Sequence, residues 1–289
     1  MMKMKKIMTL MLALGLMVSA AACGAKEAEA VSEPVETEAA EAGGEEMSEV
    51  LKKIKDNGKL VLGTSADYPP FEFHVSVDGK DQIVGFDIDI AKEIAKELGV
   101  ELEIKDMKFD GLLAALDQGV VDLVIAGMSP TPEREENADF SSIYYTAVQS
   151  LVVKTADQAS ITALSDLSGK KVGVQKGTIQ ETLAEEQMKG AEVVALGKIT
   201  DIVLSLKSGR IDAAIIELPV AEKTVEANED LSVSTISLDA GSKGKAVALK
   251  KGSEDLLAVV NQVIEKLVAE KTIDEFINAA NKLADENQE

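Results

Sequence analysis

The stretch Asp122–Arg134, DLVIAGMSPTPER, begins as an apolar segment and passes through Gly127 into what we predict is the start of a helix. Its early residues, Leu123–Ala126, are apolar or small, as in a strand buried on both faces of a parallel sheet. Ser129 and Arg134 then supply a hydroxyl, a main-chain N–H and a planar guanidinium. Because such donors suit a carboxylate, the stretch predicts one wall of an anion-binding site at the end of a strand.

Strand and helix patterns alternate on both sides of this stretch, and the alternation restarts near residue 150. The predicted strands are 59–65, 101–104, 123–126, 150–154, 171–175, 193–196, 211–216 and 246–249. The predicted helices are 87–98, one capped by Asp110 and ended by Gly119, 179–189, 201–207, 253–267 and 272–283, with a short helical turn at 164–169. Two adjacent prolines after Tyr68 predict a stiff, extended loop. The order predicts an α/β fold.

The pattern Leu-x-x-Gly-x-x-Asp occurs at residues 116–122 and again at 206–212, each time between a predicted helix and a buried strand. This repetition favours two similar lobes, each a mostly parallel sheet flanked by helices. The last two helices follow the second series and are expected to pack back on the first lobe. The chain would then cross between lobes twice, near residues 145–149 and 239–245, forming a two-strand hinge with the ligand in the cleft.

The expected domains follow from this order. Lobe 1 comprises residues 50–146 plus 243–289, and lobe 2 comprises residues 147–242. Residues 1–22 combine a basic start, an apolar run and a small-residue tail, as in a signal peptide. Residues 23–49 contain nine Glu and no apolar periodicity, which predicts a disordered acidic tether.

Cys23 is the only cysteine and directly follows the predicted signal peptide. Its position is similar to the acylated cysteine of bacterial lipoproteins, although Ala20 stands where that pattern more often has Leu. We therefore expect lipidation of Cys23, with acyl chains such as palmitate, and a lipid anchor on the extracytoplasmic face of the cell membrane. The alternative is a secreted protein with an incidental cysteine.

Composition argues against several classes of function. The formal net charge of −21 is opposite to what nucleic-acid binding requires. There is one histidine, His74, and no zinc-binding set, phosphate-binding loop or dinucleotide fingerprint. We therefore expect no metal, no cofactor and no catalytic residue.

Binding is better supported by the residue pattern. Glu217 directly ends the predicted strand 211–216, and ligands of open α/β sheets lie at the carboxyl ends of strands. Across a cleft from Arg134, Glu217 would hold the ammonium group of a zwitterion whose carboxylate is bound by the guanidinium. Tyr68 and Phe109 lie in loops after strands and could sandwich a side chain or cation, or simply pack in the core.

Six segments in order resemble the polar amino-acid family of extracytoplasmic solute-binding proteins of ABC importers. They are LVLGTSADYPPFEF, GFDIDIAKEIAKELG, FDGLLAALDQGVVDLVIAGMSPTPER, DFSSIYY, GKKVGVQKGTIQE and GRIDAAIIELPVA, and the resemblance covers residues 58–265. It implies a monomeric protein that captures a free amino acid by lobe closure. The closed protein would deliver it to an ABC permease and its ATPase.

The resemblance also implies roles for individual residues. The carboxylate would be bound by Arg134 and by main-chain N–H groups at Ser129 and Ile179, the latter set by the Gly177–Thr178 turn. The ammonium would be bound by Glu217, the Ser129 hydroxyl and the Gly127 carbonyl, with Tyr68 and Phe109 flanking. Side-chain recognition would fall to Ser65, Asp87, Gln175 and Gln180. The sequence departs from the family where Glu217 replaces the commoner Asp and where Ser65 replaces an acid.

The choice of ligand depends on acidic residues near the expected cleft. Asp67, Glu72 and Asp87 favour a polar or cationic side chain. An alternative is a small dehydratase-type enzyme on the same scaffold, with the acid at position 217 as a proton donor. A sensor module is a third reading, but the chain has no downstream signalling domain.

Overall fold

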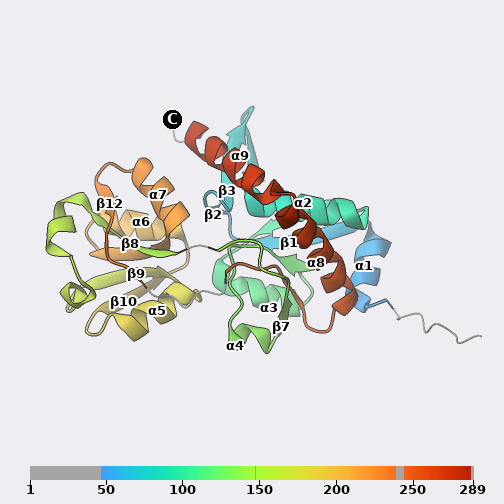
Figure 1. Cartoon of the computed structure of the whole chain (residues 1–289), viewed down its shortest axis with the longest axis horizontal. Helices are drawn as coiled ribbons and strands as arrows, with labels where there is room; N and C mark the ends of the chain where they lie inside the picture. The colour runs from blue at the N-terminus through green and yellow to red at the C-terminus, as the bar shows by residue number, and fades with distance from the viewer. Residues whose placement is uncertain (1–46, 147, 239–243, 288–289) are drawn as a thin grey trace, which may run out of the picture. The chain divides into compact units, whose positions relative to one another are not determined.

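The structure, a computed structural model, describes residues 47–146, 148–238 and 244–287. The predicted signal peptide, Cys23 and most of the predicted tether lie outside the described residues. The unit that follows residue 45 contains two five-stranded sheets, each with its own helices (Figure 1).

The sheet of lobe 1 has the order β5 (Glu101–Asp106), β1 (Lys59–Thr64), β6 (Leu123–Val124), β13 (Ala248–Lys250) and β7 (Ala138–Phe140). β1 pairs in parallel with β5 and β6, whereas β13 is antiparallel to both β6 and β7, so only β13 is reversed. The helices of this lobe are α1 (Glu49–Asn57), α2 (Phe86–Leu98), α3 (Leu112–Asp117), α4 (Pro132–Glu135), α8 (Glu254–Ala269) and α9 (Thr272–Glu286). α8 and α9 pack against α2, as expected.

The sheet of lobe 2 repeats this arrangement. Its order is β10 (Glu192–Leu196), β9 (Lys171–Gln175), β11 (Ala213–Glu217), β8 (Gln149–Lys154) and β12 (Leu231–Val233), and only β8 is reversed. Its helices are α5 (Ile179–Gln187), α6 (Ile199–Lys207) and α7 (Leu218–Glu226), with 3-10 turns η2 (Thr155–Ser160) and η3 (Leu164–Leu167). The matching orders confirm the predicted two-lobed α/β fold with mostly parallel sheets.

In each sheet the reversed strand follows a crossing between lobes. The two crossings meet at an antiparallel bridge between Tyr145 and Lys245. The Lys245 N–H donates to the Tyr145 carbonyl at 2.7 Å, and the Tyr144 N–H donates to the Lys245 carbonyl at 2.9 Å. Residues 147 and 239–243 of the predicted hinge lie outside the described residues.

A third, small sheet was not predicted. It consists of β2 (Asp67–Tyr68), β3 (Glu72–Val77) and β4 (Lys80–Val84), joined in antiparallel pairs. The bond between Pro69 and Pro70 is cis and lies in the turn between β2 and β3. The prediction of an extended loop here was wrong, because the prolines occupy the turn, where no ladder N–H is required.

The repeated Leu-x-x-Gly-x-x-Asp pattern forms the same structure in both lobes. Asp122 Oδ2 accepts a hydrogen bond from the Val61 N–H on β1 at 2.9 Å, and Asp212 Oδ2 accepts one from the Lys171 N–H on β9 at 2.8 Å. The glycines that end the preceding helices have φ values of 67° and 71°, which a residue with a Cβ rarely adopts. Each aspartate therefore ties the loop before one buried strand to its neighbour.

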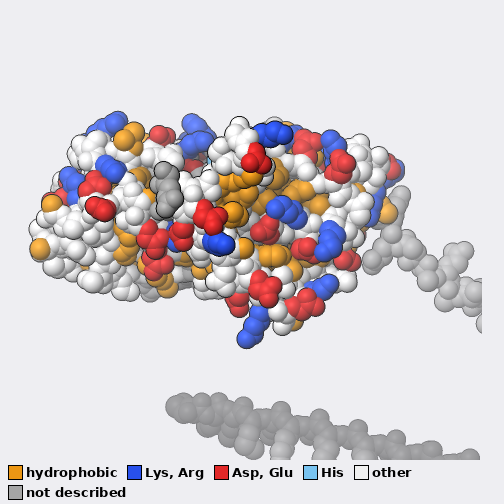
Figure 2. Space-filling view, turned by 90° about the horizontal axis from the view of Figure 1, so that it is seen from above, with side chains coloured by type: hydrophobic (Ala, Val, Ile, Leu, Met, Phe, Trp, Pro, Cys, Tyr) orange, Lys and Arg blue, Asp and Glu red, His pale blue; other side chains and the backbone are white. Residues whose placement is uncertain are grey.

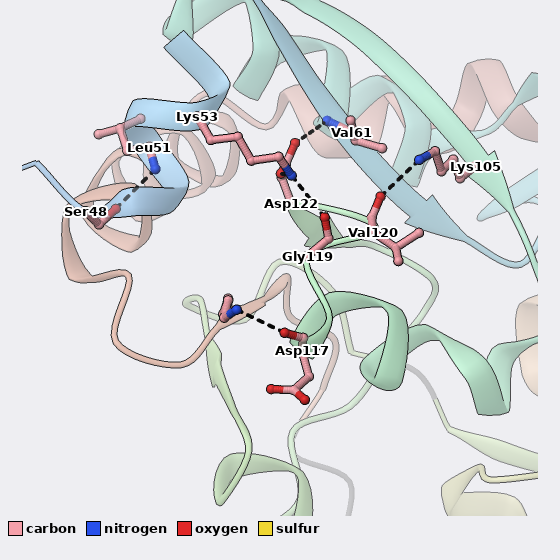
Figure 3. A network of polar contacts seen from close by, with 10 residues as sticks. Ser48, Leu51, Lys53, Val61, Lys105, Asp117, Gly119, Val120 and Asp122 are labelled. Carbon is pink, nitrogen blue, oxygen red and sulfur yellow. Dashed lines mark hydrogen bonds and ion pairs between the residues drawn. The ribbon is translucent and has the colours of Figure 1, made fainter. Parts of the chain in front are cut away.

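In lobe 1 this tie extends to the first helix. Lys53 of α1 reaches Asp122 Oδ1 at 2.9 Å and the Gly119 carbonyl at 3.0 Å (Figure 3). α1 begins at Glu49, after Ser48, whose hydroxyl accepts from the Leu51 N–H at 3.2 Å. Residues 48 and 49, assigned above to the tether, therefore belong to the folded part.

The predicted cap of the third helix was also wrong. α3 begins at Leu112 without a side-chain cap, and Asp110 lies before it in the 3-10 turn η1 (Phe109–Gly111). The Asp110 carboxylate instead pairs with Lys176 of lobe 2 at 3.0 Å. The Asp110 side chain therefore forms an ion pair between the lobes and does not cap the helix.

One apolar cluster contains residues of both lobes, because β2 lies against α6. Asp67 of β2 accepts a hydrogen bond from the Ile199 N–H at 2.6 Å, and Tyr68, Phe71, Ile199 and Ile202 belong to the cluster.

Acidic and basic side chains are interspersed on the face seen in Figure 2. Within the described part of the chain, no helix is long and apolar enough to cross a membrane.

Candidate functional site

A narrow cleft lies between the lobes, where about 340 Å³, open solvent included, is free of protein atoms. It is lined by Ser65, Tyr68, Glu72, Phe109, Ala126, Gly127, Ser129, Arg134, Gln175, Thr178, Ile179, Gln180 and Lys245. Most of the predicted ligand-binding residues are therefore brought together. Asp87 and Glu217 are absent from the lining, and the unpredicted Lys245 is present.

Arg134 forms the anion-binding wall from the side of lobe 1. Its guanidinium donates to the Ser129 carbonyl at 2.6 Å and, across the cleft, to the Gly177 carbonyl at 2.8 Å. It also lies 5.3 Å from the centre of the Phe109 ring. Burial lowers the pKa of Arg134 to about 10, and of the described acidic groups only Glu133 counteracts this shift. The side chain is thus a largely desolvated, fixed cation at the cleft.

The facing wall is the start of α5 in lobe 2. Thr178 is the N-cap, and its hydroxyl donates to the Gln175 carbonyl at 2.6 Å. Thr178, Ile179 and Gln180 line the cavity, and N–H groups in the first turn of a helix have no acceptor within the helix. Gly177 has a φ of 76°, which turns the chain toward Arg134. A carboxylate between Arg134 and this helix start would meet donors from both lobes.

The two aromatic residues predicted to flank the ligand both line the cavity. Phe109 carries the Arg134 guanidinium on its ring, and Tyr68 packs against Phe71 with ring centres 5.3 Å apart. Burial, and then the negative charge of Glu217, raise the pKa of Tyr68 well above its ordinary value. Tyr68 therefore remains a neutral phenol at the cavity wall.

Glu72 is the acidic residue that reaches the cavity. It is 1% exposed, and its Oε2 atom has no hydrogen-bond partner among the described residues. Burial, followed by the nearby Asp87, raises the pKa of Glu72 well above its ordinary value. Gln175 Nε2, also at the cavity, is a buried donor that likewise has no partner in the described chain. Buried polar groups are normally paired, so both atoms indicate a polar ligand group.

Asp87, which is expected to recognise the ligand side chain, is not among the residues that line the cavity, and this role stays a prediction. Its Oδ2 atom accepts from the Gly127 N–H at 2.7 Å and from the Tyr144 hydroxyl at 2.9 Å. Burial raises its pKa to about 6, although these hydrogen bonds oppose the shift. Because α2 begins beneath the loop after β6, Asp87 lies behind Gly127 and positions that turn.

Glu217 is fully buried and lies behind Lys245 rather than on the cavity surface. Its Oε1 atom accepts from Gln149 Nε2 at 2.9 Å and is in direct contact with Lys245 Nζ. Lys245 Nζ also donates to the Ser129 hydroxyl at 3.1 Å. Sequence reasoning missed Lys245, because only its place in the hinge brings it to the cleft.

Two further predicted residues differ in their surroundings. Ser65 lines the cavity, and its hydroxyl lies 3.2 Å from Asp67 Oδ1. Asp67 itself faces lobe 2 through Ile199 and does not line the cavity. No group of three or more His, Cys, Asp or Glu side chains that could hold a metal occurs among the described residues.

Comparison with known families decides the kind of protein. The profile of the bacterial extracellular solute-binding proteins, family 3, matches residues 60–280. The chain belongs to this family. Its matched region contains both lobes and every residue that lines the cavity, which agrees with the resemblance derived from the six sequence segments.

Similar proteins include characterised members of the family. The arginine-binding extracellular protein ArtP of Bacillus subtilis is 46% identical over 199 residues, covering 68% of this chain and 76% of its own. The L-cystine-binding protein TcyJ of Escherichia coli is 36% identical, covering 78% and 83%. The crystal structure of the amino acid ABC transporter substrate-binding protein AbpA of Streptococcus pneumoniae, bound to L-arginine, has a TM-score of 0.79 and 45% identity, covering 81% and 98%.

ArtP and TcyJ are named as amino-acid-binding proteins, and AbpA is named as an amino acid ABC transporter substrate-binding protein. This family 3 protein is accordingly an extracytoplasmic amino-acid-binding component of an ABC importer and not an enzyme. The alternative of a dehydratase on the same scaffold is not supported.

Proposed function

We propose that this family 3 protein captures a free α-amino acid with a cationic side chain, arginine foremost, and delivers it to an ABC permease and its ATPase. The observation that carries the choice of a cation is the buried Glu72 carboxyl group in the wall of a cavity that also contains Arg134; its one side-chain partner is another acid, Asp87, and its Oε2 atom accepts from no donor among the described residues. The L-arginine bound to the similar AbpA protein supports it independently. Closure of the lobes around the ligand would produce the form that the permease recognises.

Each part of such a ligand has a partner of matching chemistry in the cavity. The carboxylate would lie between Arg134 and the start of α5. The side-chain stem would lie between Tyr68 and Phe109, and its cationic end would reach Glu72 and Gln175, while Ser65 and Gln180 complete the wall. Ser129, the Gly127 carbonyl and Glu217 would surround the α-ammonium group.

The direct test is calorimetry of the purified folded part, residues 47–289, with the twenty amino acids, ornithine, cystine and a few sugars. We expect saturable binding of arginine, weaker binding of uncharged amino acids and no product. Binding confined to sugars would contradict the zwitterion assignment, and tighter binding of glutamate than of arginine would contradict the cationic assignment.

Replacement Glu72→Gln is expected to weaken arginine binding about 10- to 150-fold, because hydrogen bonds to charged groups contribute about 1.5–3 kcal/mol. Binding of an uncharged amino acid should change much less. Glu265→Gln is the matched control, since Glu265 is exposed and does not line the cavity. Calorimetry on the three proteins measures the difference, and equal losses for charged and uncharged ligands would place Glu72 outside the side-chain site.

The same residue predicts the pH dependence of binding. In the free cleft, burial and Asp87 raise the pKa of Glu72, while Lys245 opposes that shift and Asp67 adds to it. A bound cation favours the ionised carboxylate, so the complex holds fewer protons than the free protein. Affinity for arginine should therefore rise with pH until Glu72 is ionised in the free protein, and fall in acid. Glu72→Gln should abolish the proton release seen by calorimetry in buffers of different ionisation enthalpy.

We further propose that residues 1–22 are a signal peptide and that acylated Cys23 anchors the mature monomer to the extracytoplasmic face of the membrane through residues 24–47. In this proposal lobe 1 comprises residues 50–146 plus 243–289 and lobe 2 residues 147–242. A cavity built from residues of one chain supports the monomer. Cys23→Ser should move the protein from the membrane fraction to the medium and abolish incorporation of labelled palmitate. Membrane retention of that variant would contradict the anchor.

A further inference from the structure

Lys245 is placed in the cleft by the hinge itself. Its backbone pairs with Tyr144 and Tyr145 of the other crossing segment, and the next residue, Ala246, donates to the Met128 carbonyl at 3.0 Å. The position of its Cα atom is thus fixed by both crossings. The side chain is 3% exposed and points into the space between the lobes, where it forms part of the cavity wall.

The Lys245 ammonium lies between Glu217 of lobe 2 and the Ser129 hydroxyl of lobe 1. These are two of the groups that would bind the α-ammonium of an amino acid. An ammonium group of the protein therefore occupies a position whose chemistry suits an ammonium group of the ligand. Glu217 can satisfy two cations only through its second oxygen, Oε2, which is buried and has no partner among the described residues.

We propose that Lys245 is a built-in competitor for the α-ammonium group of the ligand and sets the affinity and specificity of the cleft. The inference rests on the proposed function, since it concerns the same cavity. An amino acid that binds must displace the lysine ammonium from Glu217 or share one carboxylate with it. A ligand that lacks the α-ammonium, but keeps the carboxylate and the cationic side chain, avoids this competition.

The wild-type protein allows a first test that requires no substitution. L-Arginine and 5-guanidinopentanoate differ only in the α-amino group, and calorimetry gives both affinities. With Lys245 in place we expect the two to differ by less than about tenfold, since the ammonium gains little from a carboxylate that is already paired. A preference for arginine of more than about a hundredfold would overturn the inference, since a buried charge pair contributes on this scale.

Lys245→Met removes the competing charge and keeps the apolar stem. We expect it to bind L-arginine at least about tenfold more tightly than wild type and to discriminate strongly against 5-guanidinopentanoate, because an unpaired buried carboxylate gains most from a new partner. The double variant Glu217→Gln with Lys245→Met removes both charges and should lose this gain, and it remains informative if the single variant folds poorly. Lys250→Met, on β13 and outside the cavity, is the matched control.

The outcomes separate the inference from the proposed function. Amino-acid binding by wild type with equal or weaker binding by Lys245→Met would overturn the inference alone, and weaker binding would assign Lys245 to the ligand itself. Absence of binding by both proteins to every amino acid would overturn the proposed function and the inference with it. A gain that persists in the double variant would show that steric bulk, not charge, is responsible, and would also overturn the inference.

Discussion

Replacement of Arg134 by alanine is expected to lower the affinity for amino acids roughly 30-fold to several thousandfold, since truncating one partner of a buried charge pair costs about 2–5 kcal/mol. The guanidinium is the main positive charge facing the carboxylate position, and its two backbone contacts hold it there. Burial already disfavours its charge, as the lowered pKa of about 10 shows. A ligand carboxylate would compensate this desolvated positive charge. In the alanine variant the guanidinium is gone, so the carboxylate loses this partner.

The measurement is calorimetry with arginine on wild type and variant. Arg210→Ala is the matched control, because Arg210 is exposed in lobe 2 and its side chain donates only to Ser208 in the described hydrogen bonds. The affinity of Arg134→Lys for arginine should lie between those of wild type and Arg134→Ala, since an ammonium lacks the planar pair of donors that fits a carboxylate. Circular dichroism should confirm that the variants are folded, because Arg134 also joins the lobes through Gly177. Unchanged affinity in Arg134→Ala would refute the carboxylate assignment.

The largest expected effect on stability is that of Gly85→Ala. Gly85 precedes α2 with a φ of 131°, and a Cβ atom there would lie 2.1 Å from the Phe71 carbonyl oxygen. Both the backbone strain and the overlap are unfavourable, and together they should cost about 3 kcal/mol or more. For a domain of this size, such a cost lowers the melting temperature by roughly 6–12 °C.

Gly111→Ala is the matched control, because Gly111 has a φ of −93° and no atom within 4 Å of an added Cβ. Thermal unfolding followed by circular dichroism compares the two variants with wild type. The Gly85 clash also involves the backbone beside Glu72, so ligand binding should weaken in parallel. A melting temperature equal to that of the Gly111 variant would show that the loop before α2 relaxes without cost.

The parts of the fold with a strong local signal could be predicted from the sequence. β9 has the predicted bounds, and α2, α8 and α9 differ from prediction by at most a few residues at each end, because their apolar periodicity is a local signal, to which Gly99 adds at the end of α2. β2, β3 and β4 were missed, since they pair with one another around a proline turn and carry no buried apolar run of usual length. α7 was not predicted; Pro219 lies in its first turn, two residues after Glu217.

The residues of the candidate site likewise divide into those that could be predicted from the sequence and those that could not. Arg134, Ser129 and Thr178 could be found because each follows a strand in sequence, and the ends of parallel strands converge. Asp87 also had a suggestive position, yet its carboxylate accepts from the Gly127 N–H and the Tyr144 hydroxyl and lies behind the cavity wall. Lys245 and Glu72 depend on the hinge and on an unpredicted sheet. The role of Lys245 could not be predicted before the lobes were assembled, whereas Glu72 was among the acidic residues expected near the cleft.

Because one apolar cluster joins β2 to α6, we expect the two lobes to unfold together. Contacts shared across the lobes oppose independent melting, as expected where an interface is apolar and continuous with both cores. Ligand held in the cleft at about a hundred times its dissociation constant contributes about 2.7 kcal/mol to the free energy of unfolding. That contribution is to the unfolding of the whole unit, which includes β10 at the edge of the lobe 2 sheet, none of whose residues lines the cavity.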